Sequence, residues 1–196
     1  IDDVPLRFNP QWLNKNSGAY LTWFMDKGPD ALQFGNDVDL VVNANVLFAL
    51  ARYGLADTPG FSETAVLIND AVENDLHRSS WDDISLYYPD SYVFHYCVTR
   101  AYAKGPVPEL AASVARLASE IIDDARRCPD GTAHWDKGHP RLNTAFAVLS
   151  LINAGSNSSL IDEGVAYLER TQNPVSGAWD EAPFFIARAD SGIVIE

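Results

Sequence analysis

The sequence predicts an all-α protein built from helical hairpins that repeat about every fifty residues. Three apolar stretches with helical periodicity each end in a glycine, at Gly54, Gly105 and Gly155. Glycine commonly follows the last residue of a helix because it adopts a positive φ at little cost. The glycines are 51 and 50 residues apart, and a fixed period in this range indicates a repeat architecture. No segment alternates polar and apolar residues between turn signals, as a strand would.

A second, more polar helix is expected before each of the later apolar ones. The clearest example, in residues 108–127, has apolar residues on one face and charged residues on the other. Its apolar positions are Leu110, Val114, Leu117, Ala118, Ile121 and Ile122. A loop with a tryptophan followed by an acidic residue comes next, at Trp81, Trp135 and Trp179, and Trp23 is a looser fourth copy. Each unit is therefore interpreted as an outer amphipathic helix, a Trp loop and an inner apolar helix.

The inner helices are apolar almost all round, which is typical of helices that are covered on every side. An α/α toroid covers them, whereas an open solenoid leaves one face in water. We therefore expect a toroid or partial toroid in one domain spanning 1–196. Three units take about 150 residues and the fourth stops before its closing glycine. Either the natural chain is longer, or a second copy or another domain completes the ring.

The composition excludes several classes of partner. The net charge is −13, with no basic cluster to offset it, so nucleic acids and anionic membrane surfaces are repelled. No apolar run reaches the roughly 18 residues of a membrane span, and the N-terminus is acidic where a signal peptide is basic. The two cysteines form no disulfide pattern. A cytoplasmic protein is expected.

Residues 164–179, "GVAYLERTQNPVSGAW", resemble the QW repeat of squalene and oxidosqualene cyclases. In that motif an aromatic and an aliphatic residue precede a Gln-containing turn that ends in Gly-x-Trp, and Tyr167, Leu168, Gln172, Gly177 and Trp179 match these positions. The glutamine is expected to cap the carbonyls of the outer helix, and the indole to stack on or donate to the neighbouring turn. The resemblance implies an α/α toroid of the terpenoid cyclase and prenyltransferase type.

A second resemblance concerns chemistry. The segment "NDVDL", with Asp37 and Asp39, looks like the DxDD-type acid of class II terpenoid cyclases, although Leu40 stands where the motif has its third acid. It implies that Asp39 is a general acid that protonates an isoprenoid in an apolar cavity. Asp37 would assist it, and no metal or other cofactor would be needed. The competing interpretation is that both aspartates cap the following helix.

Residues 89–97, "PDSYVFHYC", look like the zinc-binding segment of protein prenyltransferase β subunits, with Asp90 matching. Ser91 replaces the zinc cysteine and is a poor zinc ligand, so no metal is expected there. His134 and His139 flank Asp136, and we interpret this grouping as chance. His95 is expected to be a hydrogen-bonded core residue, and His77 carries no signal.

Several further residues are candidates for ligand binding. Asn43 interrupts an apolar helix one turn after Asp39, so it is either a lock between helices or a ligand contact. Asp90 lies one repeat after Asp39 and can face the same cavity mouth. The aromatic candidates are Trp81, Trp135, Phe184 and Phe185. They either pack between repeats or line a cavity and stabilise carbocations.

Three functions fit these observations. The first is a terpenoid-cyclase-like enzyme acting on an isoprenoid. The second is a non-catalytic toroid that binds a hydrophobic ligand or a protein partner, which the missing third acid favours. The third is a carbohydrate-active α/α toroid, in which a pair of carboxylates would do the chemistry. A homo-oligomer is expected if a second copy completes the ring.

Overall fold

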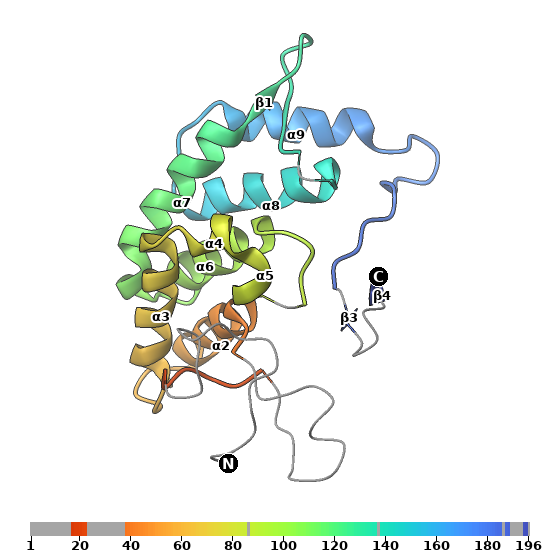
Figure 1. Ribbon diagram of the computed structural model, residues 1–196. Helices are drawn as coiled ribbons and strands as arrows, with labels where there is room; N and C mark the ends of the chain where they lie inside the picture. Colours follow the sequence, from red (N-terminus) through yellow and green to blue (C-terminus); the bar gives the residue numbers. More distant parts are fainter. Residues whose placement is uncertain are drawn as a thin grey trace.

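The computed structural model describes residues 17–22, 38–85, 87–136, 138–185, 187–188 and 194–195. This part of the chain is mostly helical, which confirms the all-α prediction (Figure 1). Asp37 and Trp23 lie outside the described residues.

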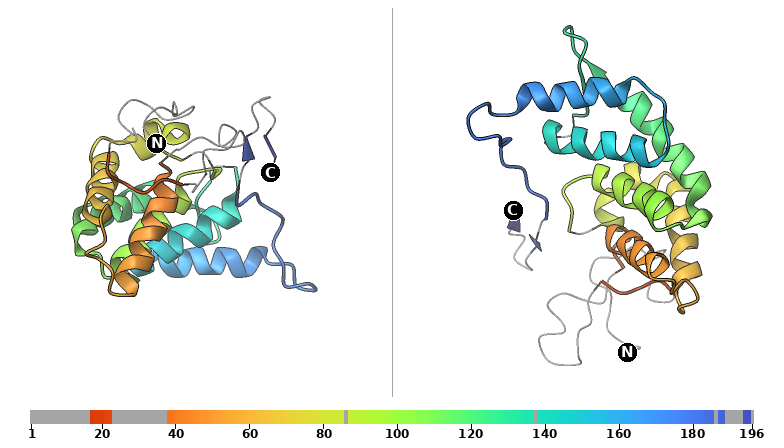
Figure 2. Two further views of the ribbon diagram at one scale, coloured as in Figure 1. Left: turned by 90° about the horizontal axis from the view of Figure 1, so that it is seen from below. Right: turned by 180° about the vertical axis from the view of Figure 1, so that it is seen from behind.

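Three helical hairpins form the body of the protein. The inner helices are α2 (Leu40–Arg52), α6 (Tyr92–Lys104) and α8 (Pro140–Asn153). The outer helices are α3 (Phe61–Glu73), α7 (Ala111–Asp124) and α9 (Leu160–Thr171). Each outer helix packs on the inner helix that precedes it in the chain, and α6 packs between α2 and α8. Figures 1 and 2 show the hairpins following one another in chain order, so the predicted repeat is present.

The connections contain short elements that the sequence did not predict. They are α4 (Leu76–Ser79), α5 (Trp81–Ile84), the 3-10 helix η1 (Pro108–Leu110) and the strands β1 (Arg126–Arg127), β2 (Ala133–His134), β3 (Ala187–Arg188) and β4 (Val194–Ile195). β1 pairs antiparallel with β2, and β3 with β4. Strands of two residues are too short to show alternation in a sequence.

The glycines that end the inner helices serve two different purposes. Gly54 and Gly155 have φ of 72° and 69°, as predicted for residues that follow a helix. Gly105 has a φ of −88°, so the prediction is wrong there. A Cβ at Gly105 would lie 2.6 Å from the carbonyl oxygen of Ala101 and 3.0 Å from Cα of Phe48. This glycine therefore allows α2 and α6 to approach closely.

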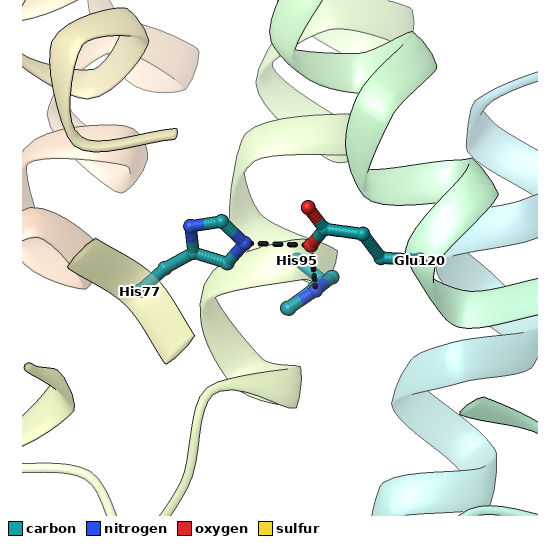
Figure 3. Close-up of side chains that lie close together, drawn as sticks. All are labelled: His77, His95 and Glu120. Carbon is teal, nitrogen blue, oxygen red and sulfur yellow. Dashed lines mark hydrogen bonds and ion pairs between the residues drawn. The ribbon is translucent and has the colours of Figure 1, made fainter. Parts of the chain in front are cut away.

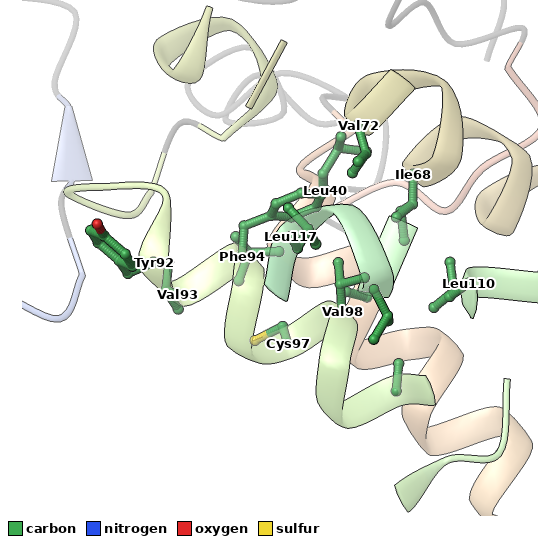
Figure 4. Packing of buried hydrophobic residues seen from close by; sticks show 14 of the residues in the cluster. Leu40, Ile68, Val72, Tyr92, Val93, Phe94, Cys97, Val98, Leu110 and Leu117 are labelled. Atoms are coloured by element: carbon green, nitrogen blue, oxygen red, sulfur yellow. The ribbon is translucent and has the colours of Figure 1, made fainter. Parts of the chain in front are cut away.

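The hydrophobic core lies between the inner and outer helices. Figure 4 shows side chains that meet there, among them Leu40 of α2, Ile68 of α3, Phe94 of α6 and Leu117 of α7. All four are completely buried. In each outer helix, apolar residues recur every three or four positions and so form one face. This amphipathic pattern determined which face packs inward.

One expectation about the inner helices is wrong. They were expected to be covered on every side, but Leu149 and Ile152 of α8 are 42% and 50% exposed. These two residues are three positions apart and share one face of the helix. In the described residues this face is therefore only partly covered, as in an open stack of hairpins.

None of the helices in the described ranges is both long and apolar enough to cross a membrane.

Candidate functional site

A row of aromatic side chains crosses the three inner helices, with Phe48 joined to the other rings through Arg100. We call it the aromatic stripe, and it consists of Phe48, Tyr87, Tyr88, Tyr96, Phe146, Phe184 and Phe185. The ring centroids of Tyr96 and Phe146 are 5.5 Å apart, and those of Phe146 and Phe184 are 6.1 Å apart. These separations fall in the range of favourable aromatic contacts. The stripe therefore extends along the stack of hairpins and not along one helix.

The stripe borders the hydrophobic core, because Phe146 belongs to the core and Phe48, Tyr88 and Tyr96 pack against it. Phe94 of α6 points into the core, and Tyr96 follows it by two residues, which is roughly 200° around a helix. Tyr96 and Phe146 are one repeat apart, so the repeat places equivalent side chains in a row. The repeat period thus places this row of rings at the edge of the core.

The C-terminal end of the stripe is open. Phe184 and Phe185 are 56% and 45% exposed, although both contact other rings. Phe184 lies edge-on to Tyr88 at 5.8 Å, and Phe185 stacks on Tyr87 at 5.6 Å. The segment after α9 returns toward the loop before α6, which brings these residues together (Figure 2). The two sequence-predicted phenylalanines therefore lie on an accessible aromatic surface.

Arg100 is a half-buried cation at the other end of the stripe. Its guanidinium carbon lies 4.5 Å from the ring centroid of Phe48 and 5.2 Å from that of Tyr96, and Nη2 donates to Oδ1 of Asn45. Cation–π contacts of this kind hold the guanidinium in place between the two rings. Burial raises the pKa of the neighbouring Cys97 thiol to about 11, so this thiol stays neutral. Sequence reasoning missed Arg100.

Asp39 caps helix α2, which confirms the capping interpretation. Its Oδ1 accepts from the backbone nitrogens of Val41 and Val42 at 2.8 and 3.0 Å, and its Oδ2 accepts from Ser85 Oγ at 2.8 Å. The residue is 1% exposed. Burial raises the pKa of Tyr88 to about 12, and the negative charge of Asp39 adds to this effect. The bond to Ser85 ties Asp39 to the loop that carries Tyr87 and Tyr88 of the aromatic stripe. Its proposed partner Asp37 is outside the described residues.

Asn43 is a lock between segments. Its Nδ2 donates to the carbonyl oxygens of Tyr20 and Asp39, and its Oδ1 accepts from the backbone nitrogen of Tyr20 and from Thr64 Oγ1. The residue is completely buried. The side-chain amide of Asn43 thus forms its hydrogen bonds within the protein. This supports the interpretation as a lock between helices and not as a ligand contact.

Asp90 occupies the start of α6. Its Oδ1 accepts from the backbone nitrogen of Tyr92 at 2.9 Å, and the residue is buried. This contact resembles the one that Asp39 makes at the start of α2. Ligand binding by Asp90 stays a prediction.

The tryptophan loops divide into packed and accessible positions. Trp135 is completely buried, and its Nε1 donates to the carbonyl oxygen of Ile121 at 2.7 Å. It has no surface for a ligand, so the ligand prediction for Trp135 gives way to packing between repeats. Trp81 is half-buried and donates to the carbonyl oxygen of Tyr88 at 3.0 Å. That bond supports the loop that carries part of the aromatic stripe.

The QW-like turn has the predicted groups in exchanged roles. Nε1 of Trp179 donates to the carbonyl oxygen of Leu168 in the last turn of α9 at 2.9 Å, whereas Nε2 of Gln172 donates to the carbonyl oxygen of Gly177 at 2.7 Å. The indole therefore caps the outer helix, and the glutamine closes the turn. Gly177 has a φ of 70°, which explains the need for glycine at this position.

A cavity of about 270 Å³ lies beside this turn. It is lined by Arg141, Leu142, Ala145, Leu168, Trp179, Asp180 and Ala182. Arg141 and Asp180 form an ion pair, and Trp179 is 44% exposed. The cavity is smaller than the pockets that hold drug-sized ligands. Its apolar lining adds to the accessible apolar surface of the third hairpin.

A buried polar cluster joins α4, α6 and α7 in the interior of the protein. His77 of α4, His95 of α6 and Glu120 of α7 point toward one another (Figure 3). Nε2 of His77 lies 2.6 Å and Nε2 of His95 3.8 Å from Oε2 of Glu120. The two histidines are 0% and 3% exposed. We call these three residues the His–Glu cluster.

Hydrogen bonds favour the ionised form of Glu120. Burial by itself raises the pKa of this carboxyl, but the hydrogen bonds that it accepts from His77 and Arg116 outweigh it, so the pKa lies well below its usual range. Burial lowers the pKa of His95, against the opposing effect of Glu120. At neutral pH the cluster therefore contains a carboxylate.

Sequence reasoning missed the His–Glu cluster. Its members are 18 and 25 residues apart along the chain and follow no metal-ligand spacing. The core position expected for His95 is confirmed, and His77 gave no signal. His134, which was considered with His139 and Asp136, stacks on Tyr167 at 5.0 Å. Among the described residues, those three do not come together as a possible metal site.

No protein family, curated protein or solved structure matches this chain.

Proposed function

We propose that this protein binds a hydrophobic ligand of the isoprenoid class along the aromatic stripe. The observation that carries the proposal is the row of ring contacts from Tyr96 to Phe185, which is open at one end. The guanidinium of Arg100 joins Phe48 to this row. A long, unsaturated chain matches such a row because its double bonds and methyl groups pack well on aromatic faces. The stripe also uses Phe184 and Phe185, which the sequence selected as candidates.

Arg100 narrows the class of ligand to isoprenoids with an anionic head group. A guanidinium matches phosphate oxygens bidentately, and this one is positioned by Asn45 and two rings at the edge of the stripe. A diphosphate at Arg100 would leave the isoprenoid tail to run over Tyr96 and Phe146 toward Phe184. The surrounding net charge of −13 selects against anions in general, so the tail must supply much of the affinity.

We also propose that the hairpins form an arc of an α/α toroid, with the aromatic stripe on its inner wall. The three inner helices pack in one row, and the outer helices α3 and α7 pack against each other, which supports this architecture. The half-exposed Leu149 and Ile152 of α8 would then face the ring interior or a further unit.

Catalysis by Asp39 is the second candidate, and its bond to the loop that carries Tyr88 favours it. The hydrogen bonds to Asp39 oppose it, because two backbone N–H donors stabilise the ionised carboxylate. A general acid must instead hold its proton until the substrate receives it. Binding without cyclisation is therefore the better supported function.

The binding proposal is tested by thermal unfolding of the full chain with farnesyl diphosphate, geranylgeranyl diphosphate and squalene. We expect the diphosphates to raise the Tm, and Arg100→Gln to weaken their binding about tenfold while affecting squalene less. Arg52→Gln, which changes an exposed arginine at the end of α2, is the matched control and should bind like the wild type. If none of the three compounds protects the protein, the isoprenoid proposal fails.

The catalytic alternative is tested by mass spectrometry of the same mixtures. A cyclised product from the wild type that Asp39→Asn does not make would establish a protonation-initiated cyclase. Bound but unchanged ligand in both proteins would leave binding as the function.

A further inference from the structure

We propose that the His–Glu cluster is a structural zinc site that ties α4, α6 and α7 together. Nε2 of His77, Nε2 of His95 and a carboxylate oxygen of Glu120 all lie within 4.8 Å of one another. Two imidazoles and one carboxylate are ligands that Zn²⁺ commonly takes in proteins. The sequence alone predicts no metal, so this site rests on the tertiary arrangement.

The separations of the ligand atoms bracket those of a tetrahedral zinc ion. Bond lengths near 2.0–2.1 Å put two tetrahedral ligands about 3.3 Å apart. The distance from Glu120 Oε2 is 2.6 Å to His77 Nε2 and 3.8 Å to His95 Nε2. Small side-chain rotations that move each ligand atom by less than about 1 Å would thus let all three atoms reach one ion. A water molecule would complete the four-coordinate site.

Outer hydrogen bonds orient two of the three ligands as they do in known metal sites. Nδ1 of His95 lies 2.7 Å from the carbonyl oxygen of Ser91, which can only accept, so Nδ1 carries the proton. The lone pair of neutral His95 is then on Nε2 and points toward Glu120. The other carboxylate oxygen, Oε1, accepts from Nε of Arg116 at 2.8 Å. Such outer contacts fix the ring tautomer and the direction of a ligating carboxylate.

A plain hydrogen-bond network explains the cluster less well. With His95 neutral, a nitrogen lone pair faces a carboxylate oxygen at 3.8 Å in a buried site, and nothing donates between them. A cation between the three ligand atoms would remove the repulsion between His95 and Glu120.

The charges nearby leave room for a cation. Arg116 pairs with Asp75 at 3.0 Å and Arg78 with Asp124 at 3.1 Å, so each arginine near Glu120 has a second acidic partner. This network holds two guanidinium groups and three carboxylates, and Glu120 is the carboxylate in excess. Because both histidines are almost completely buried, a bound ion would have little access to substrate. Three protein ligands and a water are the set that catalytic zinc sites use, so it is the burial of this site that indicates a structural role.

The test uses Zn²⁺ and Co²⁺ with the purified full chain after removal of metals with a chelator. We expect one Zn²⁺ per chain by elemental analysis. At a free concentration about 100-fold above Kd, Zn²⁺ should raise the Tm by about 5 to 10 °C. Co²⁺ should give the visible absorption of a tetrahedral site in the wild type.

Two variants locate the ion. His95→Asn and Glu120→Gln should each abolish the Co²⁺ absorption and the Tm shift, whereas His139→Asn, in a histidine at the start of α8, should keep both. If a variant does not fold, the Co²⁺ spectrum of the wild type decides. No stoichiometric Zn²⁺, no Co²⁺ absorption and no Tm shift in the wild type would overturn the proposal, as would metal binding that survives in a folded His95→Asn protein.

Discussion

Trp135 and Trp179 make the same hydrogen bond in very different surroundings. Each follows an outer helix and donates its indole N–H to a carbonyl oxygen in the last turns of that helix, at 2.7 and 2.9 Å. Trp135 is completely buried, whereas Trp179 is 44% exposed and lines a cavity. The local motif is therefore repeated, but its burial is not.

The following hairpin makes the difference. Trp135 is covered by α9, where a Cβ on Gly164 would come within 3.2 Å of its ring, and by Thr144 of α8, whose Oγ1 accepts from its backbone nitrogen. In the described residues Trp179 has no hairpin of that kind beyond it. The same residue type thus serves as core in one unit and as accessible surface in the next.

The largest effect is expected for Trp135→Ala. Removing a fully buried tryptophan leaves a large cavity and frees the carbonyl of Ile121, so the free energy of unfolding should fall by about 3–5 kcal/mol. Chemical denaturation measures this change. A loss below about 1 kcal/mol would mean that α8 and α9 do not close over Trp135 as described.

Gly164→Ala should cost less but test the same contact. The new Cβ would lie 2.5 Å from Cγ2 of Val148, and such overpacking costs about 1–3 kcal/mol, against roughly 1 kcal/mol gained from helix propensity. We expect a net loss of stability on thermal or denaturant unfolding. Val165→Ala on the exposed side of α9 is the control and should change stability little. A more stable Gly164→Ala protein would argue against close packing here.

Trp179→Ala should lower the free energy of unfolding by only about 1 kcal/mol, because the lost contacts are partly exposed and one capping hydrogen bond is removed. Denaturation in parallel with Trp135→Ala measures the ratio directly. Equal losses in the two variants would show that Trp179 is covered in solution, for example by a second copy of the chain. Light scattering would then report that assembly.

The smallest effect concerns the reactivity of the two cysteines and not the stability of the protein. It compares Cys97 in the interior of the stack with Cys128 in a turn. Burial raises the pKa of Cys97 to about 11, so near pH 8 only about one thiol in a thousand is the reactive thiolate. Cys128, in the turn between β1 and β2, is partly exposed. We expect one fast alkylation per native chain at pH 8 and two in denaturant. Cys128→Ser should remove the fast reaction, and fast labelling of Cys97 would mean that α6 is more open than described.

Much of the fold could be predicted because each helix carries its own signal. The period of the closing glycines located the hairpins, and the amphipathic pattern of α7 identified its core face. Gly105 shows where local reasoning fails, since its role is the close approach of α2 to α6 and not a positive φ. A contact between elements far apart in the chain leaves no local pattern to recognise.

The candidate sites divide in the same way. Capping by Asp39 and the choice of Phe184 and Phe185 followed from composition and position, whereas Arg100 and the His–Glu cluster did not. His77, His95 and Glu120 belong to three helices, and no spacing rule relates them.

The sequence by itself determined the all-α class, the fifty-residue hairpin unit and the helix ends, because these depend on contacts within a few turns of chain. Only the tertiary structure decided which tryptophan lies in the core, which aromatic side chains form the aromatic stripe, and which buried polar groups contact one another. Burial is a property of what packs on a residue, and the covering helix comes from another part of the chain.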